Sequence, residues 1–312
     1  MSERSGVLLM TYGSPASLEH DEVRAYLARV RGGREPDPTL VDEFSRRYRL
    51  IGGSPLIAIT RTQADRLADT LGWPVEVGMR FSEPSIGRGL VGLANRGVTD
   101  VTAIVLSPQF SPLLMGGYAA SIDDALATLG RDAPRVRVAQ AWHLQPAFVE
   151  AIARRIRDAL DRLGDRDQAT AHVLLTAHSL PRRVAEREPA YLHQLRTTAE
   201  AVAGAAGLSE RDWTFCWQSA GHEPGEWMQP DFADLMPRIA RGPAPAVVVA
   251  PIQFLADHLE VLYDIDVGAR EQAAMHGVRF VRIESLNADQ GLIEALAAVA
   301  RADAASRTGV PV

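Results

Sequence analysis

Two stretches from the first half of the chain recur, in the same order, in the second half. Residues 7–15 (VLLMTYGSP) align with residues 173–181 (VLLTAHSLP), and residues 104–110 (IVLSPQF) align with residues 248–254 (VVAPIQF). Each copy begins as a short apolar run and stops at polar, Gly or Pro residues, which is typical of a buried strand. A chain repeated in this way predicts two similar lobes.

Strand-like runs alternate with helical patterns along the whole chain. The predicted strands are residues 6–11, 74–79, 101–106, 172–177, 246–250 and 280–284, and the main predicted helices are residues 56–71, 86–95, 146–163, 191–207 and 291–304. Such alternation predicts an α/β fold in which helices flank mainly parallel sheets. We expect lobes at residues 1–145 and 146–286, with the helix of residues 287–312 packing back on the first lobe. The Trp-, Gly- and Pro-rich residues 213–230 are predicted to form a loop.

Composition limits the kinds of partner that the chain can have. Apolar residues make up 46% of the 312 positions, which is enough for two packed cores, and 33 basic residues face 39 acidic ones. Without a basic patch, nucleic acid is not an expected partner. The single cysteine, Cys216, excludes an intrachain disulfide and an iron–sulfur cluster held by four cysteines of this chain. The sequence has no signal-peptide pattern and no apolar run long enough to span a bilayer, so we expect a cytoplasmic protein.

Residues 251–266 (PIQFLADHLEVLYDID) carry an unusual acidic pattern. Pro251 should end the preceding strand because it has no N–H to give to a sheet. The following residues have helical spacing, which places Asp257, Glu260 and Asp264 on one face. Like charges at these spacings repel one another, and no Lys or Arg lies among them. A bound cation would balance them, and the alternative is a solvated outer face.

Aromatic and His residues follow the repeated strands at equivalent points: Tyr12, Phe110, His178 and Phe254. In open α/β sheets ligands bind beyond the carboxyl ends of the strands. Two lobes that face each other would place Tyr12 and His178 on opposing walls of one cleft. His178 can take a proton or bind a metal from such a position. The alternative is that these side chains close the edges of the cores.

Five segments together give the sequence a family resemblance. They are residues 12–15 (YGSP), 52–56 (GGSPL), 177–181 (AHSLP), 254–260 (FLADHLE) and 217–221 (WQSAG), the last followed by Pro224, Trp227 and Pro230. From residue 6 to about residue 304 the chain resembles the ferrochelatases, which insert ferrous iron into a porphyrin. The resemblance implies two Rossmann-like lobes with a porphyrin cleft between them.

The resemblance also implies a metal site. His178 and Glu260 match the paired metal-site residues of the family, and Asp264 matches the next acid of its carboxylate track. A porphyrin must lose two pyrrole protons and accept a divalent metal, so the site needs a base and a metal-delivering carboxylate. Which of His178 and Glu260 takes the protons is left open. Gly268 stands where Bacillus-type members can carry a further acid.

The first lobe resembles the monofunctional coproporphyrin ferrochelatases of Gram-positive type. Tyr12 matches their tyrosine that ligates the iron of the product. The positions that hold propionates in that group are matched by Arg31, Arg47, Tyr48, Ser54 and Tyr118. Arginine forks suit carboxylates, and coproporphyrin carries four propionates against two in protoporphyrin.

The resemblance implies a monomeric enzyme of haem biosynthesis that converts coproporphyrin III and ferrous iron into coprohaem. Beyond its iron substrate it is expected to need no cofactor and no iron–sulfur cluster. Three alternatives stay open: a ferrochelatase that acts on protoporphyrin IX, a cobalt or nickel tetrapyrrole chelatase, and a haem or porphyrin carrier without enzymatic activity.

Overall fold

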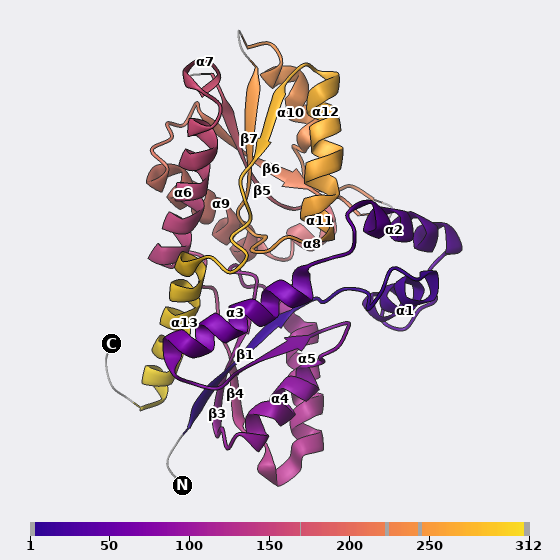
Figure 1. The fold of residues 1–312 in the computed structure, drawn as a ribbon, viewed down its shortest axis with the longest axis vertical. Coiled ribbons are helices and arrows are strands. Elements are labelled where there is room, and N and C mark those ends of the chain that lie inside the picture. Colours follow the sequence, from indigo (N-terminus) through magenta and orange to yellow (C-terminus); the bar gives the residue numbers. More distant parts are fainter. Residues whose placement is uncertain (1–3, 169, 222–224, 243–244, 309–312) are drawn as a thin grey trace. The chain divides into compact units, whose positions relative to one another are not determined.

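The computed structural model describes residues 4–168, 170–221, 225–242 and 245–308. Pro224, one residue of the family resemblance, lies outside this part of the chain. The fold consists of two compact units, each built on its own parallel sheet (Figure 1). One unit contains Met1–Trp142, Ala256–Leu259 and Asn287–Val312, and the other contains His143–Leu255 and Glu260–Leu286.

The sheet of the first unit has the strand order β2-β1-β3-β4. Its strands are β1 (Ser5–Thr11), β2 (Val75–Met79), β3 (Asp100–Val105) and β4 (Arg135–Val138). Its helices are α1 (His20–Val30), α2 (Pro38–Leu50), α3 (Leu56–Leu71), α4 (Ile86–Asn95), α5 (Pro112–Leu129), the short 3-10 helix Gly130–Asp132 and α13 (Gln290–Thr308). All neighbouring strands in this order run parallel.

Helices cover both faces of this sheet (Figure 1). Leu8 and Met10 of β1 pack with α4 and α5 in one core cluster. On the other face α3 contacts β1 and β2, and α13 contacts α3 and β3. Residues 7–10 are therefore apolar without alternation, as expected for a strand buried on both sides. Each such Leu contributes about 1.5–3 kcal/mol by leaving water.

The second unit repeats this plan with the strand order β6-β5-β7-β8. Its strands are β5 (His172–His178), β6 (Trp213–Gln218), β7 (Ala246–Pro251) and β8 (Arg279–Arg282). Its helices are α6 (Pro146–Asp161), α7 (Asp165–Gln168), α8 (Arg182–Ala185), α9 (Pro189–Ala205), α10 (Phe232–Ile239), α11 (Leu259–Leu262), the π-helix η2 (Asp264–Ala269) and α12 (Arg270–Met275). In both sheets the strand that comes second in the sequence lies outside the first, and the third and fourth follow on the other side. The two halves of the chain therefore share one topology as well as similar sequence segments.

The faces of the second sheet are covered as in the first unit (Figure 1). Leu174, Val247 and Val249 pack in one core cluster with residues of α10 and α12. On the other face α6 contacts β7 and α9, and α9 contacts β6. Two parallel sheets flanked by helices confirm the α/β fold that the sequence predicts.

Two regions differ from the sequence-based prediction. The predicted loop at residues 213–230 is wrong in its first part, because Trp213–Gln218 forms strand β6 and pairs with β5. Aromatic and β-branched residues favour a strand there, and the Gly and Pro residues that suggested a loop come later. The predicted helix after Pro251 is also wrong in its first part: helical structure begins at Leu259, and residues 252–258 are irregular.

Candidate active site

His178 is the last residue of β5 and lies at the carboxyl end of the second sheet. Its backbone N–H donates to Oε1 of Gln253 at 2.8 Å, and its Nδ1 lies 2.5 Å from the carbonyl oxygen of Ser179. A carbonyl oxygen accepts only, so Nδ1 carries the proton. In the neutral ring, Nε2 is then left with a lone pair for a proton or a metal. The ring of Phe254 meets the imidazole edge-on, with 6.3 Å between ring centres.

Glu260 is the second residue of α11, and its Oε1 lies 3.8 Å from Nε2 of His178. This is too long for a hydrogen bond. Two metal–ligand bonds to nitrogen and oxygen placed end to end span about 4.2 Å, so a single divalent ion can touch both atoms. Both side chains are partly open to solvent, with 29% and 39% of their surface exposed. The pair combines a lone pair, a carboxylate and an approach for an ion.

Asp257 is not on a helix with Glu260, which corrects the predicted acidic face. It lies in the irregular segment before α11 and forms two hydrogen bonds with the side chain of Asn287. The Asp257 N–H donates to Asn287 Oδ1 at 2.9 Å, and Asn287 Nδ2 donates to Asp257 Oδ2 at 3.0 Å. The helical wheel assumed one uninterrupted helix, whereas this contact with a distant residue holds the chain in another conformation.

Asp264 begins the π-helix η2, in which the backbone bonds span five residues instead of four. The N–H of Gly268 donates to the carbonyl oxygen of Tyr263 at 2.9 Å in this way. Asp266, inside the wide turn, accepts two hydrogen bonds from Arg282 of β8, at 2.8 and 2.9 Å. π-Turns of this kind occur often at functional sites.

The structure therefore brings His178 and Glu260 together. Asp257 instead binds Asn287, and Asp264 begins the π-helix η2. Among the residues that the structure describes, no three His, Cys, Asp or Glu side chains gather as a ready-made metal site. The metal-binding roles of His178, Glu260 and Asp264 stay predictions. The pair at the end of β5 suits transient metal binding better than permanent storage, because a structural metal site usually supplies four protein ligands.

Tyr12 follows β1 in the first unit and exposes 49% of its surface. Its ring contacts Phe81 and Tyr118, with ring centres 5.3 Å and 6.3 Å apart. Tyr118 is buried beneath it, and this burial raises the pKa of the Tyr118 phenol. Arg80 lies over both neighbouring rings, 4.7 Å from Phe81 and 5.4 Å from Tyr118. The Tyr12 side chain is thus accessible to solvent and packs on two aromatic rings, both of which also contact Arg80.

The other predicted propionate residues lie where helices of the first unit end or begin. Arg31 follows α1 and is exposed, and Ser54 lies two residues before α3. Arg47 and Tyr48 are in the last turn of α2, where Tyr48 is buried and Arg47 is half-buried. Tyr48 and Tyr118 are both under 5% exposed, so neither offers more than a small part of its side chain to a ligand.

Arg47 is already paired within α2. Its Nε donates to Oε1 of Glu43 at 2.7 Å, and Arg46 holds the same carboxylate. These hydrogen bonds, that of Arg46 first, lower the pKa of Glu43 to about 2. A propionate bound by Arg47 would therefore compete with Glu43 or share the guanidinium with it.

Two residues beside the predicted ones were missed by the sequence analysis. Gln253 binds the backbone of His178, and Arg80 lies over the rings next to Tyr12. Both follow a strand by one or two residues, as Tyr12 does. The strand-end position was thus the available signal, but it was applied to aromatic and His residues alone.

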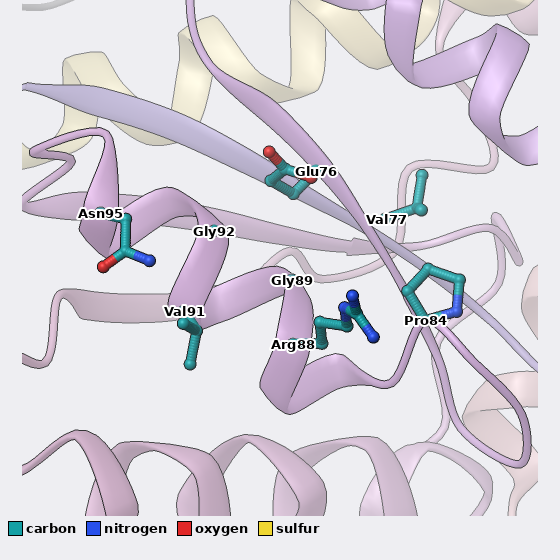
Figure 2. A pocket seen from close by; sticks show the side chains of 8 residues that line it. All are labelled: Glu76, Val77, Pro84, Arg88, Gly89, Val91, Gly92 and Asn95. Carbon is teal, nitrogen blue, oxygen red and sulfur yellow. The ribbon is translucent and has the colours of Figure 1, made fainter.

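A hollow of about 290 Å³ in the first unit is separate from these residues. Figure 2 shows Arg88, Val91 and Asn95 along α4, with Glu76 and Val77 on the neighbouring strand β2. Glu76 already pairs with Arg96 at 3.3 Å. The volume is at the lower limit for ligand pockets, and none of the predicted site residues lines the hollow.

In the described ranges, no helix combines the length and the apolar character needed to cross a membrane. The comparison with solved structures places the fold among chelatases. SirB from Bacillus subtilis, solved with Fe³⁺, aligns with a TM-score of 0.60 and 12% identity over 98% of both chains. CbiX, described as the terminal enzyme of sirohaem biosynthesis in denitrifying bacteria, aligns with a TM-score of 0.53 and 15% identity over 96% of this chain and 99% of CbiX. At these identities the likeness concerns the fold alone.

Sequence relatives are more specific. The ferrochelatase family profile matches residues 4–304. A protein of Deinococcus radiodurans named ferrochelatase is 36% identical over 96% of both chains. A protein of Anoxybacillus flavithermus named coproporphyrin III ferrochelatase is 32% identical over 94% of both chains. The chain therefore belongs to the ferrochelatase family of metal-chelating enzymes.

Proposed function

We propose that this enzyme inserts ferrous iron into coproporphyrin III and releases coprohaem, with no resident cofactor, as a monomer in the cytoplasm. The observation that carries the proposal is the distance of 3.8 Å between His178 Nε2 and Glu260 Oε1. One iron ion replaces two pyrrole protons, so each turnover needs a proton acceptor and a carboxylate that releases the metal. The lone pair of His178 Nε2 and the charge of Glu260 meet these needs at one place.

Coproporphyrin is the proposed substrate for two reasons. Tyr12 presents an exposed side chain that packs on the rings of Phe81 and Tyr118, which suits an axial ligand of the product iron. Arg31 and Arg47 offer guanidinium groups for propionates, of which coproporphyrin has four. The name of the Anoxybacillus relative agrees with this choice, while the Deinococcus relative is named for the wider activity.

The direct test is an anaerobic assay with ferrous iron and either coproporphyrin III or protoporphyrin IX. We expect turnover with both iron and coproporphyrin III present, and a clearly lower kcat/KM with protoporphyrin IX. Equal values would assign the enzyme to the wider ferrochelatase activity. The absence of any metalloporphyrin with iron, cobalt or nickel would support a porphyrin carrier instead.

Variants test the metal site. His178→Ala should abolish insertion while fluorescence titration still shows coproporphyrin binding, and His276→Ala, which removes an exposed imidazole, should leave turnover unchanged. Glu260→Gln keeps the shape of the side chain and removes its charge, so it should destroy insertion even at saturating iron. Asp264→Asn should mainly raise the apparent KM for iron. Near-normal turnover by His178→Ala or Glu260→Gln would remove these residues from the site.

A further inference from the structure

The backbone at His178 lies where the pairing of two strands runs out. The register between β5 and β7 ends with Thr176 opposite Pro251, and the N–H of Ile252 still donates to the Thr176 carbonyl oxygen at 3.0 Å. Beyond Ile252 the chain leaves the sheet, so β7 has no carbonyl to offer the N–H of His178. On the other side β6 continues, and the N–H of Ser179 donates to the Gln218 carbonyl oxygen at 2.7 Å.

The side chain of Gln253 replaces the missing backbone acceptor. Its Oε1 accepts the N–H of His178 at 2.8 Å. A backbone N–H only donates, so the amide oxygen must face it and the amide nitrogen must face away. That nitrogen donates to the hydroxyl of Tyr191, a residue of α9 that is 1% exposed. Gln253 therefore connects the end of β5 to a fixed point in the core of the second unit.

The same short segment also limits rotation of the imidazole. Phe254, the next residue, lies edge-on to the ring at an interplanar angle of 89°. The carbonyl oxygen of Ser179 holds Nδ1. Gln253 holds the backbone of His178, and Phe254 and Ser179 hold its ring on two sides. Nε2 is thereby directed toward Glu260, which lies seven residues after Gln253 in the chain.

We propose that Gln253 is a positioning residue of the metal-insertion site, which it serves by holding His178 so that Nε2 faces Glu260. The inference rests on the proposed role of His178 and goes beyond it by naming the group that orients this residue. Loss of a hydrogen-bond partner that orients a metal ligand typically lowers metal affinity or activity by about 10–100-fold. Small displacements of a reacting group have effects of similar size.

The test compares the kcat of three variants. Each kcat is calculated per porphyrin-binding site, measured by titration, so that it refers to folded enzyme. Gln253→Leu keeps the approximate volume and removes both hydrogen bonds. We expect a fall in kcat of about 10–100-fold, with the KM for porphyrin nearly unchanged. Gln253→Glu keeps an acceptor for His178 and can accept from the Tyr191 hydroxyl, so it should recover most of the lost kcat. Tyr191→Phe keeps the first bond and removes the anchor, so a loss of a few-fold is expected.

The outcomes separate this inference from the proposed function. If His178→Ala turns over normally, the metal site itself is wrong. If His178→Ala is inactive while Gln253→Leu has the kcat of the wild type, the positioning role of Gln253 is refuted. Equal kcat values for Gln253→Leu and Gln253→Glu would also refute it, because only one of them retains the acceptor. Should Gln253→Leu fail to fold, a wild-type kcat in Tyr191→Phe would overturn the inference.

Discussion

The π-helix η2 contains an ion pair between Asp266 and Arg282, with Arg270 3.9 Å from the same carboxylate, which makes Asp266→Asn an informative change. Asp266 lies in η2, and its two carboxylate oxygens accept from Nε and Nη2 of Arg282 at 2.8 and 2.9 Å. The side chains expose 25% and 12% of their surfaces, so the pair is largely shielded from water. Asparagine fits the same space but carries no charge, and it offers one acceptor oxygen to the guanidinium where Asp266 offers two.

The expected cost follows from what Arg282 retains. Breaking a fully buried pair costs about 3–5 kcal/mol because one charge is left without a partner. Here Asp266 is one quarter exposed, and Arg282 still donates to the Ile283 carbonyl oxygen at 2.9 Å and to Ser285 Oγ at 3.1 Å. We therefore expect Asp266→Asn to lower the free energy of unfolding by about 2–3 kcal/mol.

Urea unfolding of the full chain measures this change. Arg282→Gln should cost a similar amount, and the double variant should lose about 1–2 kcal/mol less than the two single losses combined, because neither member of the pair is then left charged without the other. Asp158→Asn, which changes an exposed aspartate of α6, should stay within about 0.5 kcal/mol of the wild type. Simple addition of the two single losses, or an effect of Asp266→Asn no larger than that of the control, would refute the reasoning.

Three further outcomes are expected. Tyr12→Phe should change the visible and resonance Raman spectra of bound coprohaem, since the exposed phenol is the proposed axial ligand, and identical spectra would place the ligand elsewhere. Arg31→Ala should weaken coproporphyrin binding by up to about fivefold because Arg31 is exposed, and protoporphyrin less; equal losses in fluorescence titrations would contradict a role in selection. Burial lowers the pKa of His172, so its contribution to stability is complete above about pH 6.5 and is lost as the pH falls below that value. His172→Gln should flatten the dependence of the unfolding free energy on pH between about 8 and 5.5, and an unaltered slope would disagree.

The sequence predicts most of the fold because the repeated strands are apolar on both faces, and in a chain that alternates strands with helices this pattern is typical of parallel sheets covered on both sides. It also predicts that His178 lies at the carboxyl end of a strand, and in the structure Oε1 of Glu260 lies 3.8 Å from its Nε2. Asp257 was misplaced because its conformation depends on Asn287, thirty residues away. Gln253 was missed because its task arises only from the register of β5 and β7, which no local pattern contains.

The π-helix η2 affects how residues 261–273 tolerate a change in length. Val261, Ile265, Ala269 and Ala273 are all fully buried, and they recur at every fourth residue. In an ordinary α-helix each step of four residues turns about 40° too far, so three steps would carry Ala273 about 120° away from Val261. Bonds that span five residues reduce the rotation per residue and keep all four against the core. Loss of one residue from Asp264–Ala269 would shorten one of these steps from four residues to three, and an ordinary α-helix keeps that spacing on one face. The π-helix therefore accommodates one residue more than an α-helix with the same buried stripe would hold, and we expect the segment to tolerate that single deletion as an α-helix.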